Sequence, residues 1–149
     1  MQVDFEKIRE SVKLASGRDR VWQALTTPNG LAAWWAERAE IEPMDGGILR
    51  LHFSNRRILD SKVIMCRAPE YLAFVYFGGT RAAFELATNP AGGTIVTVTD
   101  SGFSSQQDYA ETLAGWVSVL LALKAQVDFG VDLRNHNPVF SWEHGFADN

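Results

Sequence analysis

The chain has 149 residues, a length typical of one domain, and 46% of them are hydrophobic, which excludes a disordered or fibrous protein. Its 14 basic and 18 acidic side chains give a net charge of -4 without runs of like charge, so nucleic acid and anionic membranes are not expected partners. The single cysteine, Cys66, permits no internal disulfide, and the first residues lack the pattern of an export signal, which predicts a cytoplasmic protein. No apolar stretch reaches the roughly 20 residues of a membrane span.

The first part of the chain predicts a strand followed by two short helices. Residues 5–14 alternate enough to suggest the strand, and residues 18–26 suit a short helix that must stop before Pro28. Asn29 offers a cap for the second helix, which carries Trp34 and Trp35. Neighbours on a helix point about 100° apart, so we expect one tryptophan to pack in the core and the other to line a cavity or stay partly exposed.

The middle of the chain predicts an antiparallel sheet. Five stretches rich in β-forming residues follow one another, at residues 48–54, 57–67, 71–77, 80–88 and 94–101. Their connections have the length of hairpins, too short for the crossovers of a parallel sheet. There are three glycine pairs, Gly46-Gly47, Gly78-Gly79 and Gly92-Gly93. Each leads into a strand and not into a helix, which favours turns over phosphate-binding loops.

A long amphipathic helix is expected next. Ser105 begins a sequence of the capping-box form, and Gly130 is well placed to end the helix in a left-handed conformation. Between them, apolar residues recur at spacings of three and four and include Trp116 and Leu120. One antiparallel sheet with one face to bury and one helix to cover it predicts an α+β fold in which the sheet curls around the helix. Residues 131–149 form an aromatic tail, which we expect to pack on the domain or on a partner.

Few residues predict chemistry. The three histidines lack the helical spacing of a zinc site and no second cysteine exists, so neither a metal nor another cofactor is expected. Asp100 follows Val96 and Val98 on one face of a strand. It either caps the strand end and its turn, or is a carboxylate at the mouth of a cavity and then a weak catalytic candidate.

Four motifs in this order resemble the START-like, or SRPBCC, superfamily, and within it the homologues of the activator of heat-shock-protein (Hsp90) ATPase. They are Val21-Trp22-Gln23-Ala24-Leu25-Thr26-Thr27-Pro28 with Trp34-Trp35, Ala68-Pro69-Glu70-Tyr71-Leu72-Ala73-Phe74, the strand from Gly93 to Phe103, and Gly115-Trp116. The resemblance implies a helix-grip fold: a curved antiparallel sheet wrapped around the C-terminal helix, with a cavity between them. It implies a domain over residues 1–130, to which residues 131–149 are an extension.

Members of the superfamily differ in function, so the fold alone does not select one. The sequence favours the binding of an apolar or aromatic small molecule over catalysis, because an enzyme would need a second polar group beside Asp100. The alternatives are a protein-interaction module like the chaperone ATPase activators, with a homodimer or a protein partner held through the tail, and a cyclase-like enzyme using Asp100. The residues expected to enclose the ligand are Trp34, Trp35, Phe74, Phe84, Val96, Val98, Asp100, Trp116 and Leu120.

Overall fold

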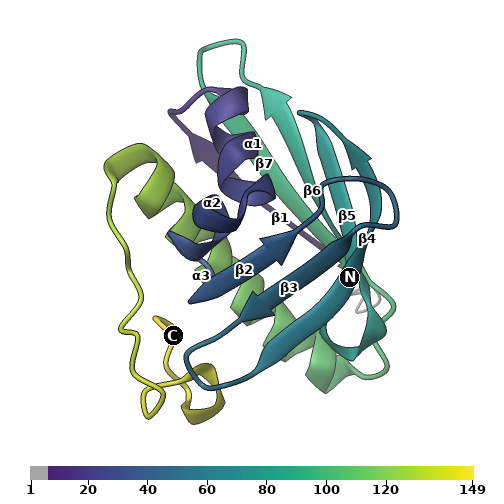
Figure 1. The fold of residues 1–149 in the computed structure, drawn as a ribbon, viewed down its shortest axis with the longest axis vertical. Helices are drawn as coiled ribbons and strands as arrows, with labels where there is room; N and C mark the ends of the chain where they lie inside the picture. Colours follow the sequence, from purple (N-terminus) through teal and green to yellow (C-terminus); the bar gives the residue numbers. More distant parts are fainter. Residues whose placement is uncertain (1–6) are drawn as a thin grey trace, which may run out of the picture.

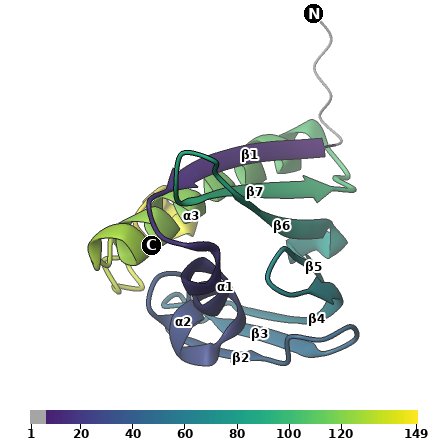
Figure 2. The same ribbon diagram turned by 90° about the horizontal axis from the view of Figure 1, so that it is seen from above.

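A seven-stranded antiparallel sheet is the centre of the computed structural model, which describes residues 7–149. The strand order is β1-β7-β6-β5-β4-β3-β2, so the strands from β2 to β7 follow one another as hairpins, while β1 pairs with β7. Figure 2 shows the sheet curling so that its two ends enclose a concave face. The strands are β1 (Lys7–Leu14), β2 (Arg38–Ile41), β3 (Ile48–His52), β4 (Ile58–Arg67), β5 (Tyr71–Val75), β6 (Arg81–Thr88) and β7 (Thr94–Ser101).

The long helix α3 (Gln106–Phe129) covers the concave face of this sheet (Figure 1). The Ser105 hydroxyl accepts a hydrogen bond of 3.1 Å from the backbone amide of Asp108, and Gly130 ends the helix with φ 66°. Trp116 and Leu120 are among the helix residues buried toward the sheet. The predicted α+β fold, with a curved antiparallel sheet, a long C-terminal helix and two short helices after the first strand, is therefore confirmed.

By length and composition alone α3 is apolar enough to cross a membrane. This is weak evidence, because the core helix of a soluble domain meets the same condition. Here one face of the helix is buried on the sheet, as its amphipathic spacing predicts.

The short elements differ from expectation in three places. Helix α1 (Arg18–Thr26) ends before Pro28 as predicted, but α2 (Pro28–Ala32) is capped by Thr27, whose hydroxyl accepts a hydrogen bond of 3.0 Å from the amide of Gly30. Because α2 ends at Ala32, the two tryptophans at 34 and 35 follow the helix and do not lie on it. Strand β2 was not expected, and the first two residues of the predicted strand 5–14 lie outside the described part.

The tail, residues 131–149, leaves the end of α3 and folds back along the domain (Figure 1). It contains one short 3₁₀ helix, η2 (Trp142–His144). There Glu143 accepts a hydrogen bond of 3.1 Å from the side-chain amide of Asn55, in the turn between β3 and β4. The tail thus connects the end of α3 with the turn between β3 and β4.

Candidate functional site

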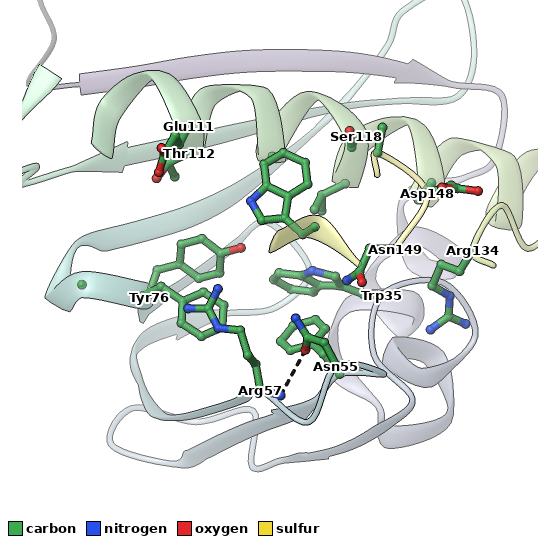
Figure 3. A pocket seen from close by; sticks show the side chains of 18 of the residues that line it. Trp35, Asn55, Arg57, Tyr76, Glu111, Thr112, Ser118, Arg134, Asp148 and Asn149 are labelled. Atoms are coloured by element: carbon green, nitrogen blue, oxygen red, sulfur yellow. Dashed lines mark hydrogen bonds between the residues drawn. The ribbon is translucent and has the colours of Figure 1, made fainter. Parts of the chain in front are cut away.

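A pocket of about 560 Å³ lies between α3, the hairpin ends of the sheet and the tail (Figure 3). Residues from five regions of the sequence meet in it: the segment after α2 with Trp34 and Trp35, the turns around residues 53–57 and 76–80, the end of the β7–α3 connection together with the first three quarters of α3, and the tail. Its aromatic lining residues are Trp34, Trp35, Phe53, Tyr76, Phe77, Phe103 and Trp142.

Trp35 connects this pocket to the core. Its ring stacks on that of Trp34, with centroids 5.2 Å apart and planes 18° apart. It also contacts Phe84 edge-on at 5.9 Å and lies 5.8 Å from Trp116. A ring held on several sides gives the pocket a fixed apolar wall, because aromatic contacts of this kind each add to the burial of the ring.

The structure separates the residues predicted to enclose the ligand into two groups. Trp34 and Trp35 line the pocket, and both are buried, whereas the sequence suggested that they would point apart. The others lie outside the pocket lining, in the packed core behind it; they are Phe74, Phe84, Val96, Val98, Asp100, Trp116 and Leu120. The alternation that places a residue on the inner face of a strand does not tell whether neighbours fill the space in front of it.

Asp100 lies in the interior, with no exposed surface. Its Oδ2 accepts a hydrogen bond of 3.0 Å from the indole Nε1 of Trp116. Burial raises the pKa of this carboxyl above its ordinary value, and hydrogen bonds from Trp116, from Thr80 and from the Ser101 backbone oppose that effect only in part. Asp100 pairs with Ile8 and Ala82 in the sheet, so it lies neither in a surface turn nor at the pocket mouth.

Polar groups reach the pocket from α3 and the tail as well as from hairpin ends; they include Asp108, Glu111, Thr112 and Ser118 of α3 and Arg134, Asp148 and Asn149 of the tail. Two hairpin-end residues, Tyr76 and Arg57, supply hydrogen-bond donors. Tyr76 follows β5, and Figure 3 shows its hydroxyl directed into the pocket. Burial, helped by the charge of Asp100, raises the pKa of Tyr76, so that the phenol stays neutral and able to donate a hydrogen bond. The Arg57 guanidinium lies 4.4 Å from the ring centroid of Phe77.

Tyr76, Phe77 and Arg57 were not predicted to line a pocket, because sequence periodicity identifies helices and strands but not which of their ends meet. The signal was the group of aromatic residues beside a glycine turn, Tyr76-Phe77-Gly78-Gly79, where large apolar side chains at a hairpin end need a covering surface. Within residues 7–149, no group of histidine, cysteine and carboxylate side chains is arranged to hold a metal ion.

Solved structures share this fold. A protein from Staphylococcus saprophyticus superposes with a TM-score of 0.77 and 22% identity, over 86% of this chain and 96% of its own. The Aha1 dimer from Colwellia psychrerythraea gives a TM-score of 0.73 and 26% identity, over 83% and 97% of the two chains. A protein of the dynemicin biosynthetic locus gives 0.72 and 26%, over 84% of this chain and 48% of that one.

Sequence comparison agrees with the fold. None of the curated proteins matches the chain significantly. The family model described as activator of Hsp90 ATPase homolog 1-like protein matches residues 15–128, from the end of β1 to the end of α3. Since this match covers most of the chain and the resemblance in the sequence is confirmed, the protein belongs to the family of proteins similar to the activator of Hsp90 ATPase homolog 1, within the START-like superfamily.

Proposed function

We propose that the protein binds an apolar or aromatic small molecule in the pocket between α3, the sheet and the tail. The observation that carries the proposal is the presence of seven aromatic side chains around one cavity of about 560 Å³. Small-molecule pockets commonly measure about 300 to 1,000 Å³ and combine an apolar lining with a few polar groups. Aromatic rings suit flat apolar ligands, because they offer large surfaces for stacking.

Two hydrogen-bond donors at the hairpin end of the pocket specify one end of this ligand. The Tyr76 hydroxyl and the Arg57 guanidinium both come from hairpin ends and both act as donors. Within residues 7–149 the Arg57 guanidinium forms no ion pair, although the carboxylates of Asp108, Glu111 and Asp148 also line the pocket, so its charge is available to a ligand. The ligand we propose therefore carries an oxygen that accepts hydrogen bonds, such as a carbonyl or an acidic group, at the end of its aromatic part.

The cyclase-like alternative has less support. A general acid or base must come within hydrogen-bond reach of the reacting atoms. The carboxylate of Asp100 is instead bound to Trp116 inside the core and does not line the pocket. We therefore propose a binding protein, and we place it in the cytoplasm, where the free thiol of Cys66 would stay reduced.

Contact with another protein is the second candidate, including a homodimer. It is favoured by the family and by the apolar side chains exposed around the end of α3, of which Phe129 is 71% exposed and Leu121 and Val131 about half. The Aha1 protein of Colwellia psychrerythraea is described as a dimer. Light scattering of the protein and of its Phe129→Ser variant would test this candidate, because a dimer held by this surface should dissociate in the variant.

A fluorescence titration tests the small-molecule proposal. The neutral dye N-phenyl-1-naphthylamine should bind saturably at one equivalent and quench tryptophan emission. Ser118→Phe places a ring in the pocket from α3 and should abolish binding. Val117→Phe is the matched control, because Val117 is the exposed neighbour on the same helix and should leave binding unchanged. Equal binding by both variants would place the dye elsewhere and refute the proposal.

A further inference from the structure

The tail supplies one side of the pocket. Six of its residues line the cavity: Leu133, Arg134, Trp142, Ala147, Asp148 and Asn149. In Figure 3 the labelled members of this group, Arg134, Asp148 and Asn149, lie on the side of Trp35 away from Tyr76, with Asn149 beside Trp35. The family match ends at residue 128, so this wall is added to the part of the chain that the family model describes.

The tail is anchored on α3 at a glycine. Two carbons of the Trp142 indole, Cζ2 and Cη2, lie 3.5 and 3.7 Å from the position that a Cβ atom of Gly115 would occupy. A Cβ atom at position 115 would thus be in ordinary contact with the indole, and a larger side chain would occupy the space that the indole fills.

A second anchor lies at the end of α2. The guanidinium of Arg134 donates hydrogen bonds of 2.7 Å to the carbonyl oxygens of both Ala32 and Ala36. Ala32 is the last residue of α2, and a carbonyl at a helix end lacks a partner within the helix, which favours a cation there; Ala36 lies in the segment that follows the helix. Asp132 orients the guanidinium through a 2.9 Å contact with its Nε, and the Arg134 side chain is only 6% exposed.

Within residues 7–149, no backbone hydrogen bond joins the tail beyond Val131 to the sheet. The backbone hydrogen bonds of this part of the tail join tail residues to each other, as in the 2.8 Å bond from the amide of Asn135 to the carbonyl of Asp148. Apolar tail side chains such as Val139 and Phe140 remain largely exposed. The tail can therefore detach by breaking side-chain contacts alone, while sheet and helix stay intact.

We infer that the tail is a movable wall of the pocket: Trp142 contacts the bound ligand, and the ligand enters and leaves when the tail detaches from α2 and α3. The inference rests on the proposed small-molecule function. In this arrangement Arg134 holds the tail against the domain, and Trp142 determines which ligands fit the pocket.

The test follows tail release and dye exchange in the same variants of the full chain. Arg134→Gln should increase the hydrogen exchange of tail amides and speed both association and dissociation of N-phenyl-1-naphthylamine about tenfold, because bonds to a charged donor hold the closed form. Arg20→Gln, at an exposed arginine of α1, is the matched control and should change neither quantity. Trp142→Ala should weaken dye binding more than Phe146→Ala, which removes a tail aromatic that does not line the pocket.

Each outcome decides between the two proposals. Faster tail exchange together with faster dye exchange supports the movable wall. Faster tail exchange with unchanged dye rates overturns it, and so does full protection of the tail in the double variant Arg134→Gln, Trp142→Ala. Absence of dye binding in the unmodified protein and in all variants instead refutes the proposed pocket function, and the movable wall with it.

Discussion

The indole nitrogen of Trp116 on α3 donates a 3.0 Å hydrogen bond to the buried carboxylate of Asp100 on β7. This bond joins the long helix to the sheet at a point where neither residue contacts solvent. A buried polar pair of this kind fixes the register of helix on sheet, because any shift would leave both groups without partners.

Replacing Trp116 should therefore be severe. Trp116→Ala removes a buried aromatic side chain and leaves Oδ2 of Asp100 without its donor, so we expect the free energy of unfolding to fall by about 3–5 kcal/mol. Urea unfolding measures this loss. The exposed neighbour supplies the control, since Val117→Ala should change stability by less than about 0.5 kcal/mol. A loss below about 1 kcal/mol for Trp116→Ala would mean that the packing described for α3 is wrong.

Asp100 should make stability depend on pH in the acidic range. Its pKa is raised by burial in the folded protein, whereas the unfolded side chain titrates near its ordinary value. The folded state therefore binds more protons between the two pKa values, and stability falls as pH rises from the lower to the higher of them. In Asp100→Asn this contribution should disappear. Urea midpoints measured at several pH values compare the two proteins, and parallel profiles would contradict the prediction.

His136 should make attachment of the tail depend on pH near neutrality. Hydrogen bonds to Asp132 and to Glu37 raise its pKa, while partial burial and the nearby Arg134 oppose the shift. The protonated form thus favours the attached tail: its contribution is complete below the ordinary value of about 6.5 and is lost as pH rises through the raised pKa. The NMR signal of the Trp142 indole N–H reports attachment. A signal that moves equally in His136→Gln would show that another group is responsible.

The charge of Arg57 should select among ligands of one shape. The dyes N-phenyl-1-naphthylamine and 8-anilinonaphthalene-1-sulfonate differ by one sulfonate. If Arg57 holds the acidic end of the ligand, Arg57→Gln should weaken binding of the sulfonate about tenfold and leave the neutral dye unaffected, since a hydrogen bond to a charged group contributes about 1.5–3 kcal/mol. Arg56→Gln is the control, because this neighbour does not line the pocket. An equal loss in both variants would reflect general charge attraction only.

The sequence predicted the elements well where local signals were strong. The limits of α1 follow from Pro28, those of α3 from Ser105 and Gly130, and β7 begins and ends where its alternation does. Strand β2 escaped because it has four residues, two of them charged, at the edge of the sheet, where charges are tolerated and no strong alternation is required.

A cavity beside the long helix was predicted from the sequence, but most of the residues that line the pocket were not. Inner-face residues such as Val96 and Val98 were expected to line it, yet neighbouring side chains cover them. The lining depends on which hairpin ends and which tail residues meet across the cleft. Those contacts join residues far apart in the chain, such as Asn55 with Glu143, and no local pattern describes them.

The contact between Trp142 and Gly115 provides a way to sort related chains. A leucine or phenylalanine at the position of Gly115 would occupy the space that the indole now fills, so helix and tail cannot change independently. Relatives that pair a small residue there with a tryptophan in a C-terminal extension should share this closed arrangement. Relatives with a bulky residue at the position of Gly115 and no C-terminal extension should have an open groove, and should therefore bind larger or differently shaped ligands with the same fold.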